Sequence, residues 1–549
     1  MEKSTIRAGG DRRVATGRAV LSAAVAVIGG WCAVAGAAPV TWALSGGGDF
    51  NTPANWNPAA VPTVADDAIF EDNASGLIST SAASNPLRLS FRKSTGSLSI
   101  DASAGTMSLG STTAGGAVIL GTAAGQVNDI TLSGGTFAAT HTTAGALMQV
   151  GNFAGSHGNR LTITGAGTHF TSPSTSGAVG AVGIAGSNDN TLSVQNGANV
   201  VLRGSLAVGV IGATPSTGNL LSVNSATFSL TGGSRGINLR NGTLSLTNGY
   251  SDVGFLLAND AGNNTTILFS SGQLYSRRTQ VDNGKNFVIG DGGAIPAVYG
   301  VAYSTGTMTV GSAAAPVDLV LASNGVLTGG GAGTITLAAG GKLRGSPGAK
   351  VMPSIIGQPV LTTDDRATGT INFTGLWDNT DLELVMDVGD FPTAASAPSP
   401  FIPLDLINVN GAFTHGGTVS FNVAGYVEPA APTEYKVVGW TSEIGVSSST
   451  AVQFVGGPAL SYRFATDGLY LTVPEPAATG RSLDRVSVEG AVAVLVLKCP
   501  HRPDPSRSRG CIPAASSPEE ALVGVFDRLP GIFRPVGLID GNCTRTTSQ

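Results

Sequence analysis

The sequence of 549 residues is poor in charge, in aromatic side chains and in cysteine. Charged residues make up 12% of the chain, against roughly a quarter in an average globular domain. Cysteine occurs only at positions 32, 499, 511 and 543, which excludes disulfides and cysteine zinc sites from residues 38–480. No Gly-x-y period is present, which excludes collagen, and a mean hydropathy of +0.21 argues against solvated disorder.

Acidic residues outnumber basic ones, and the formal net charge is −5. The excess is larger in residues 38–480, because both ends of the chain hold more basic than acidic residues. A surface of this sign repels phosphate backbones, so we expect no nucleic-acid partner.

The first 37 residues are typical of an export signal. Basic residues precede the apolar run Ala19–Ile28, and Ala35-Gly36-Ala37 offers the small side chains that signal peptidase requires. We expect cleavage before Ala38, with Ala35 and Ala37 at the cleavage site. The alternative is a membrane anchor, but the apolar run is shorter than the roughly 20 residues that span a bilayer.

An internal repeat begins near Ala117. Asn128, Asn159, Asn190 and Asn219 each open a segment of the form Asn-x-Leu/Ile-x-Ile/Val or a close variant, at steps of 31, 31 and 29 residues. A glycine that ends a short apolar run precedes each of these segments. A fixed period of this size indicates a repeat architecture.

The pattern inside each repeat predicts β-strands. Apolar and polar residues alternate with period two, as in Leu161-Thr-Ile163-Thr, and Gly-rich turns interrupt them every five to ten residues. We therefore expect an all-β fold, a β-solenoid of the right-handed parallel β-helix type with non-repetitive β caps. The domains expected are a signal peptide (1–37), an N-terminal cap (38–80), solenoid repeats (81–345), a C-terminal β region (346–473), a sorting motif (474–478) and a disordered tail (479–549).

The two flanks of the repeats resemble one bacterial family. At the start the resemblance rests on Gly46-Gly47-Gly48, Asn51-Thr-Pro-Ala-Asn55-Trp56 and Asp66-Asp67-Ala68-Ile69-Phe70. At the end it rests on Gly345-Ser346-Pro347-Gly348, Asp405–Val409, Gly417–Phe421 and Gly468–Val473. These segments resemble the opening and closing parts of proteins with autotransporter-associated β-strand repeats. At the end of the last of them, Val473, Pro474, Glu475 and Pro476 form a motif similar to the PEP-CTERM sorting signal.

The resemblance implies an exported bacterial protein of the cell surface or of the exopolysaccharide matrix. Its partners would be signal peptidase and extracellular polysaccharide or envelope components. Beyond Ala478 the chain departs from the family, because Arg481, Asp484 and Arg485 interrupt the apolar helix that should follow. The sorting tail is therefore degenerate in this chain.

Some β-solenoids cleave polysaccharides with paired carboxylates, so the acidic clusters are candidates for catalysis. The densest are Asp364-Asp365-Arg366 and Asp381-x-Glu383 with Asp387. On one strand face, Asp381 and Glu383 would lie about 7 Å apart, a spacing compatible with acid/base catalysis. The alternation with Leu382, Leu384 and Met386 is more typical of a half-buried edge strand, and we expect no catalytic residues.

The remaining motifs carry weaker signals. Gly232-Gly-Ser234-Arg-Gly236 matches a nucleophile elbow only in form, since no strand-to-helix context supports it. Histidines 141, 157, 169 and 415 lack metal-ligand spacing and are expected in exposed turns. Calcium would favour the oxygen-rich corners Asn188-Asp189-Asn190, Asn259-Asp260 and Asp282-Asn283, but these residue types are also ordinary in turns, so no metal or cofactor is expected.

Three functions remain open. The first is a non-catalytic exported protein of the cell envelope or exopolysaccharide matrix, which the resemblance favours. The second is a carbohydrate-active β-helix enzyme, and the third is an adhesin that binds a glycan through ladders of Thr and Asn. Glycan-array binding would separate the first from the third.

Removal of the tail is expected to cost little stability. The last predicted strand ends at Val473, and Pro474 and Pro476 cannot continue its pairing. Thermal unfolding of residues 38–549 and 38–478 should give midpoints within about 4 °C of each other. A larger drop on truncation, or pelleting of the full chain with membranes, would show that the tail contributes to the protein.

Overall fold

The computed structural model describes the backbone of most of the chain from residue 38 to residue 539. The described ranges are 38–110, 116–139, 147–172, 178–210, 214–231, 235–258, 265–301, 306–329, 332–353, 369–388, 404–423, 433–473, 483–489, 492–498, 521–529 and 532–539. Side chains are described in these ranges except at 178, 179, 332, 433, 473 and from 483 onward. The signal segment with Ala35 and Ala37 lies outside them.

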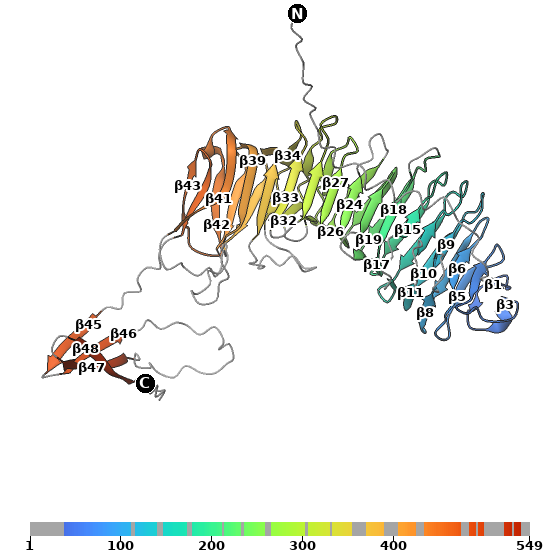
Figure 1. The fold of residues 1–549 in the computed structure, drawn as a ribbon, viewed down its shortest axis with the longest axis horizontal. Helices are drawn as coiled ribbons and strands as arrows, with labels where there is room; N and C mark the ends of the chain where they lie inside the picture. The colour runs from blue at the N-terminus through green and yellow to red at the C-terminus, as the bar shows by residue number, and fades with distance from the viewer. Residues whose placement is uncertain are drawn as a thin grey trace, which may run out of the picture. The chain divides into compact units, whose positions relative to one another are not determined.

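The chain divides into two compact units, residues 1–274 and 275–549. The first is a stack of coils whose strands form three faces (Figure 1). Face A contains β1 (Ala38–Trp42), β4 (Asp66–Phe70), β6 (Arg88–Phe91), β9 (Val118–Leu120), β12 (Met148–Val150), β15 (Ala178–Val182), β18 (Ser205–Val208), β21 (Gly236–Leu239) and β24 (Phe255–Ala258).

The other two faces of this unit follow the same order along the chain. Face B contains β2 (Gly48–Asp49), β5 (Gly76–Ser79), β7 (Ser97–Asp101), β10 (Asp129–Ser133), β13 (Arg160–Thr164), β16 (Thr191–Gln195), β19 (Asn219–Asn224), β22 (Gly242–Thr247) and β25 (Thr266–Phe269). Face C contains β8 (Thr106–Leu109), β11 (Thr136–Ala139), β14 (His169–Thr171), β17 (Asn199–Arg203), β20 (Thr227–Thr231) and β23 (Gly249–Val253). Each strand pairs in parallel with the strand of the same face in the next coil, as β15 does with β18.

The core of the first unit consists of files of apolar side chains that repeat in register. On face B the inward positions form two files, which share almost complete burial: Leu98, Ile130, Leu161, Leu192, Leu221 and Leu244, and Ile100, Leu132, Ile163, Val194, Val223 and Leu246. Burial of one such side chain is worth about 1.5–3 kcal/mol, so the files supply the main stabilisation of the stack.

The repeated asparagines form a ladder inside the corner between faces A and B. The side chains of Asn128, Asn159, Asn190 and Asn219 are fully buried. The Nδ2 atom of Asn159 donates to Oδ1 of Asn190 at 3.0 Å, and the backbone N–H of Asn159 donates to the same oxygen at 3.1 Å. The same two bonds join Asn128 to Asn159 and Asn190 to Asn219. Each step thus satisfies buried polar groups that would otherwise cost about 1–3 kcal/mol each.

A glycine in the preceding coil makes room for each step of the ladder. Gly151 has φ +75°, and a Cβ atom there would overlap the carboxamide of Asn190. Gly183 stands in the same relation to Asn219. This contact explains why each Asn segment of the sequence follows an apolar run that ends in glycine.

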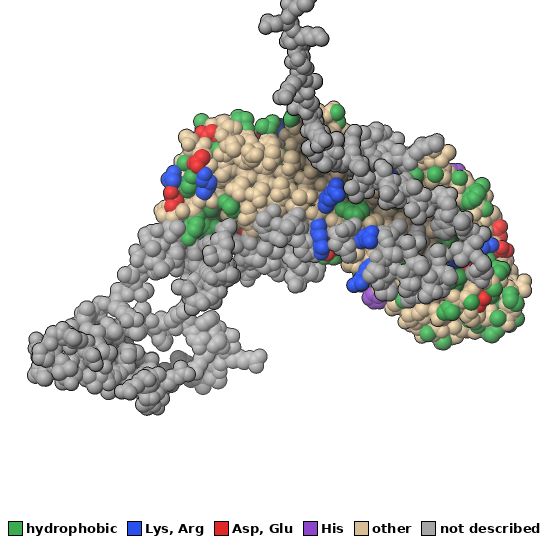
Figure 2. All heavy atoms as spheres, viewed as in Figure 1, with side chains coloured by type: hydrophobic (Ala, Val, Ile, Leu, Met, Phe, Trp, Pro, Cys, Tyr) green, Lys and Arg blue, Asp and Glu red, His purple; other side chains and the backbone are tan. Residues whose placement is uncertain are grey.

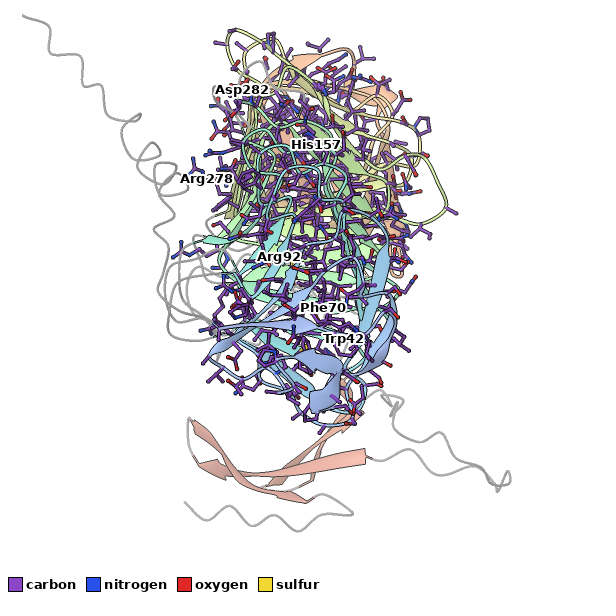
Figure 3. The ribbon with its side chains drawn as sticks, turned by 90° about the vertical axis from the view of Figure 1, so that its right-hand side faces the viewer. Trp42, Phe70, Arg92, His157, Arg278 and Asp282 are labelled. Carbon is purple, nitrogen blue, oxygen red and sulfur yellow. The ribbon has the colours of Figure 1, made fainter. Side chains whose placement is uncertain are left out.

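The N-terminal end of the first unit is covered by aromatic side chains and an antiparallel strand. The strand β3 (Trp56–Asn57) pairs antiparallel with β1. The ring of Trp42 lies edge-on to that of Trp56 at 5.0 Å, and Phe70 stacks on Phe91 at 5.1 Å. Trp42 and Phe70 are labelled in Figure 3 at this end of the stack. These rings close the apolar core at the first of the described coils.

The second unit repeats the same three-strand coil, and β26 (Gly272–Ser276) contains the boundary. Its face A contains β27 (Arg278–Val281), β30 (Thr307–Val310), β33 (Ala332–Leu337), β36 (Thr370–Thr374), β39 (Leu406–Thr414) and β41 (Thr433–Ile444). Its face B contains β28 (Phe287–Ile289), β31 (Leu319–Leu321), β34 (Lys342–Gly345) and β37 (Leu376–Asp378). Its face C contains β29 (Ala297–Val301), β32 (Gly325–Gly329), β35 (Lys350–Met352), β38 (Glu383–Asp387), β40 (Thr418–Asn422) and β42 (Ala451–Val455).

Antiparallel pairing replaces the parallel pattern at the end of these coils. The strand β44 (Gly468–Val473) pairs antiparallel with both β41 and β43 (Ser461–Ala465). Further along the chain, β45 (Leu483–Glu489), β46 (Val492–Lys498), β47 (Ala521–Leu529) and β48 (Ile532–Ile539) form a separate antiparallel sheet. These four strands lie where the sequence predicts a disordered tail.

The expected all-β solenoid with β caps is confirmed. In the described ranges the only helical segments are two short 3₁₀ turns, Pro53–Asn55 and Ser447–Ser449. None of the described helical segments has the length and apolar character needed to cross a bilayer.

Two glycine substitutions test the ladder. Gly125 and Gly151 have nearly the same φ, +76° and +75°, but a Cβ atom at Gly125 would meet no atom within 4 Å. Gly125→Ala is expected to cost about 1 kcal/mol of unfolding free energy, which is the backbone strain alone. Gly151→Ala should cost about 1–3 kcal/mol more, because it also displaces Asn190. Urea unfolding of both variants measures the difference, and equal losses would contradict the close packing of Gly151 against the ladder.

Candidate functional site

The outer surface of face B in the first unit is a regular array of hydroxyl side chains. One residue of each strand lies in register with the next in the file Ser99, Thr131, Thr162, Ser193, Ser222 and Ser245. These side chains are half-buried, apart from Thr162, which is 9% exposed. We call this file, with the outward residues on either side of it on the same strands, the hydroxyl face.

The parallel pairing fixes the spacing of the hydroxyl face. Neighbouring strands lie about 4.8 Å apart, and outward residues along one strand lie about 7 Å apart. The apolar files hold the coils in this register, and the asparagine ladder reinforces it from Asn128 to Asn219. The sequence favours the arrangement locally, because β-branched Thr suits the pleated surface and small Ser fits between neighbours.

Three strands of the hydroxyl face carry no charged residue. Their sequences are Thr-Leu-Ser-Val-Gln in β16, Asn-Leu-Leu-Ser-Val-Asn in β19 and Gly-Thr-Leu-Ser-Leu-Thr in β22. Figure 2 shows that uncharged polar side chains and backbone make up much of the described surface on the side that it draws.

Most hydroxyls of the central file are available for hydrogen bonds to a ligand. Among the described residues, Ser193 is the one member of the file with a partner, Oε1 of Gln195 at 3.4 Å. A hydroxyl both donates and accepts, so this surface can pair with other hydroxyl groups.

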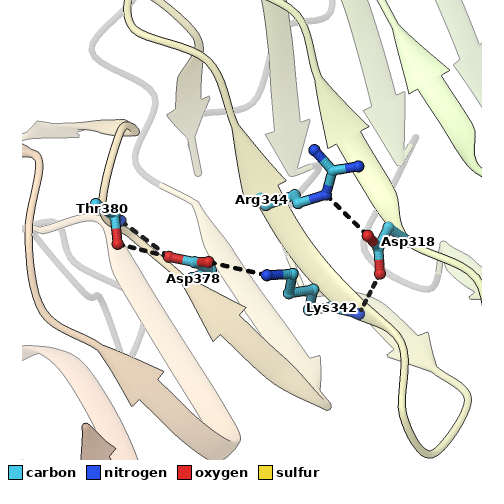
Figure 4. Close-up of polar contacts among 5 residues, drawn as sticks. All are labelled: Asp318, Lys342, Arg344, Asp378 and Thr380. Carbon is cyan, nitrogen blue, oxygen red and sulfur yellow. Dashed lines mark hydrogen bonds and ion pairs between the residues drawn. The ribbon is translucent and has the colours of Figure 1, made fainter.

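Face B of the second unit carries a different surface, a network of two cations and two carboxylates (Figure 4). The Nε atom of Arg344 donates to Oδ2 of Asp318 at 2.8 Å, and the backbone N–H of Lys342 donates to Oδ1 of the same carboxylate at 3.1 Å. The Lys342 ammonium lies 3.3 Å from Oδ2 of Asp378. Oδ1 of Asp378 accepts bonds from the N–H and the hydroxyl of Thr380, at 3.3 and 2.7 Å.

The surroundings of Asp378 keep its carboxylate ionised. Partial burial alone would raise its pKa, but the hydrogen bonds from Thr380 and the ammonium of Lys342 outweigh this effect. The pKa of Asp378 therefore lies below its ordinary value.

Of the two carboxylates considered from the sequence, only Glu383 belongs to a strand. Glu383 begins β38, but Asp381 lies in the turn before it, where the N–H of Leu382 donates to the carbonyl of Asn379. Glu383 instead accepts a bond from the Ser420 hydroxyl at 2.6 Å and lies 3.2 Å from the Lys350 ammonium. The cluster Asp364-Asp365-Arg366 lies outside the described residues.

Of the calcium candidates, the corner Asn188-Asp189-Asn190 uses its amide oxygens inside the fold. Oδ1 of Asn188 accepts the N–H of Thr217 at 2.8 Å, and that of Asn190 belongs to the ladder. At Asp282-Asn283, the Asn283 oxygen accepts the N–H of Lys285 at 3.2 Å. Asn259-Asp260 lies outside the described residues. No group of three or more His, Cys, Asp or Glu side chains suited to a metal occurs within the described part of the chain.

The histidines occupy three different environments. His157 is exposed in a turn, as expected, and its Nδ1 accepts the N–H of Asn188 at 3.0 Å. The expectation of exposed turns is wrong for the other two described histidines. His169 is half-buried in β14, and His415 is buried against Phe413 and Trp440 because it follows the long strand β39 into the core. His141 lies outside the described residues.

Two sequence motifs fall partly outside the described ranges. Gly232-Gly-Ser234 of the elbow-like motif lies outside them, and Gly236 begins β21. Val473 is the last residue of β44, whereas Pro474, Glu475 and Pro476 lie beyond the described residues.

Sequence reasoning missed the network of Asp318, Lys342, Arg344 and Asp378. Its members come from three coils that are separated by 24 to 36 residues. The one local signal is Lys342-x-Arg344, which places two cations on the same side of a strand. The register that brings the aspartates to them depends on loop lengths, which the pattern does not give.

The chain matches no protein-family model, no curated protein and no solved structure.

A pair of substitutions separates a structural from a catalytic role of the acidic cluster. Glu383→Ala should lower the unfolding free energy by about 1 kcal/mol, because it removes the acceptor of Ser420 and the partner of Lys350. Asp381→Ala, in an exposed turn, should change it by less than about 0.5 kcal/mol. Chemical unfolding compares them. A catalytic pair would instead show equal losses of polysaccharide cleavage in a reducing-sugar assay.

Proposed function

We propose that the chain is a non-catalytic, exported β-helix protein that associates with the cell surface or with the extracellular polysaccharide matrix. The observation that carries this proposal is the hydroxyl face, where small hydroxyl side chains repeat in register over six coils. Polysaccharides present repeated hydroxyl groups, and each can donate to or accept from such a surface.

The chemistry of the hydroxyl face favours many weak contacts over one tight site. A neutral hydrogen bond exchanged with water is worth only about 0.5–1.5 kcal/mol. The central file contains no aromatic side chain on which a sugar ring could stack. Binding therefore gains strength from the number of contacts along a polymer, as in multivalent association. Such binding suits a matrix component better than a receptor for one sugar.

Export is supported by the sequence of residues 1–37 and by the resemblance to PEP-CTERM proteins with autotransporter-associated β-strand repeats. The motif Val473-Pro474-Glu475-Pro476 begins at the last residue of the strand β44. A glycan-binding adhesin is the second candidate, because the hydroxyl face could also bind one particular glycan specifically. A carbohydrate-active enzyme is the third, and the separation of Asp381 from the strand of Glu383 weakens it.

Removing hydroxyls from the hydroxyl face is expected to weaken binding to neutral polysaccharide. The variant combines Thr131→Val, Thr191→Val, Ser193→Ala and Ser222→Ala, which keep the strands and remove hydrogen-bonding groups. In native gels that contain neutral dextran, the retardation of the variant should fall at least threefold relative to the unsubstituted chain. On a glycan array, the unsubstituted chain should show broad, weak binding to neutral glucans.

A matched variant controls for the loss of hydroxyls in general. Ser108→Ala, Thr136→Val, Thr171→Val and Thr227→Val remove the same number of outward hydroxyls from face C of the same unit. Its retardation should be unchanged. Equal weakening in both variants, or no retardation of the original chain, would contradict the proposed role of the hydroxyl face. Strong binding to one glycan alone would favour the adhesin.

A further inference from the structure

We propose that Arg344 and Lys342, on face B of the second unit, form a binding site for the carboxylate groups of an acidic, uronate-containing polysaccharide. The proposal rests on the proposed function, since it names a class of polysaccharide that the protein would bind. It draws on a different surface from the hydroxyl face.

The first argument is the depth of the four charged groups. Arg344 and Lys342 lie two residues apart on the same side of β34, and their side chains are 40% and 42% exposed. Their counter-ions Asp318 and Asp378 are less exposed, at 22% and 27%. The carboxylates therefore lie deeper than the cations, and the groups that a ligand meets first are positive.

The second argument is that the carboxylates hold the cations in place but occupy only some of the cations' N–H donors. Asp318 takes only the Nε–H of the Arg344 guanidinium, and its other oxygen is held by the backbone N–H of Lys342. The two Nη atoms donate to no described residue, and Figure 4 shows them pointing away from Asp318. A guanidinium that is already oriented loses less freedom on binding, and its two Nη groups present the planar, forked donors that suit a carboxylate.

The third argument is that stability does not explain the network. Exposed ion pairs contribute about 0–1 kcal/mol to folding. Asp378 has a second source of hydrogen bonds in Thr380, so Lys342 is not needed to satisfy it. The Lys342 ammonium has further N–H donors besides the one that faces Asp378, so it can also interact with a second acidic group of the polymer.

Apolar side chains beside the cations favour a sugar acid over a bare polyanion. Val320 lies in register with Arg344, and Leu376 lies in register with Lys342. Leu376 is 43% exposed, and Val288, in register with Val320, is 38% exposed. A uronate residue has a carboxylate for the cations and a C–H face for these side chains. A phosphate backbone has no such apolar face next to its charge.

The test compares polygalacturonate with its methyl ester, which has the same backbone but no free carboxylate. Both polymers are immobilised, and binding of the full purified chain is measured by biolayer interferometry at low and at physiological salt. We expect binding to polygalacturonate at least tenfold tighter than to the ester, and weaker at higher salt because ions screen exposed charges. Equal binding to both polymers would overturn the proposal.

The variants are chosen to keep the fold intact. Lys342→Gln combined with Arg344→Gln should weaken polygalacturonate binding at least tenfold. Among the single variants, Arg344→Lys should weaken binding less than Arg344→Gln but still bind more weakly than the unsubstituted chain. The matched control is Lys350→Gln, because Lys350 is 44% exposed and paired with Glu383 on face C of the same unit. It should change binding less than twofold. Thermal unfolding of each variant verifies that the solenoid is intact.

Other outcomes are equally decisive. Equal weakening by Lys350→Gln and by Lys342→Gln would overturn the site in favour of unspecific charge attraction. Double-stranded DNA bound as tightly as polygalacturonate would show a general polyanion surface and also overturn it. Dextran retardation is scored separately, so a failure of the carboxylate site with intact dextran binding leaves the proposed function standing. A loss of dextran binding alone would contradict that function but not the carboxylate site.

Discussion

The asparagine ladder is the interaction on which the first unit depends. A parallel coil must turn sharply between faces, and the backbone groups of such a corner would be buried without partners. Here Oδ1 of Asn190 accepts hydrogen bonds from both the backbone N–H and the side-chain amide of Asn159. One side chain thus satisfies two donors of the preceding coil. Before the first asparagine, the N–H of Lys93 donates to Oδ1 of Asn128. The buried ammonium of Lys93 in turn donates to the carbonyls of Glu71, Asp72 and Ala74. Burial lowers the pKa of Lys93, although the nearby carboxylate of Asp72 opposes this.

Because the ladder satisfies these corner groups internally, the outer faces are free to vary. The chain needs few charges for its fold, since register is held by the apolar files and by the amides. Face B of the first unit can therefore carry a file of Ser and Thr, and face B of the second can carry Lys342 and Arg344 without a change of architecture. A repeat fold of this kind separates the residues that hold the stack from those that meet a ligand.

The period of the asparagines and the alternation of Leu and Thr were enough to predict the coils, because both features repeat where the coils stack. The candidate surfaces were less accessible to sequence reasoning. Asp381 and Glu383 look like residues of one strand, but Asp378-Asn-Thr-Asp381 forms a turn, and the strand begins only at Glu383. The pairing of Asp318 with Arg344 depends on a loop between coils whose length follows no period. The burial of His415 depends on distant parts of the sequence, since Trp440 and Phe464 reach it from β41 and β43.

The two surfaces would differ in how a polymer binds to them. The hydroxyl face offers neutral contacts that salt hardly affects, and its strength would grow with the length of the polymer. The pair of Arg344 and Lys342 offers a few oriented donors, and its strength would depend on ionic strength and on the charge of the sugar. Neutral contacts retain a polymer of any composition, whereas oriented cations select among polymers. A matrix protein that combines the two would hold polysaccharide in general and prefer the acidic chains within it, without the aromatic sugar-binding pocket of a lectin.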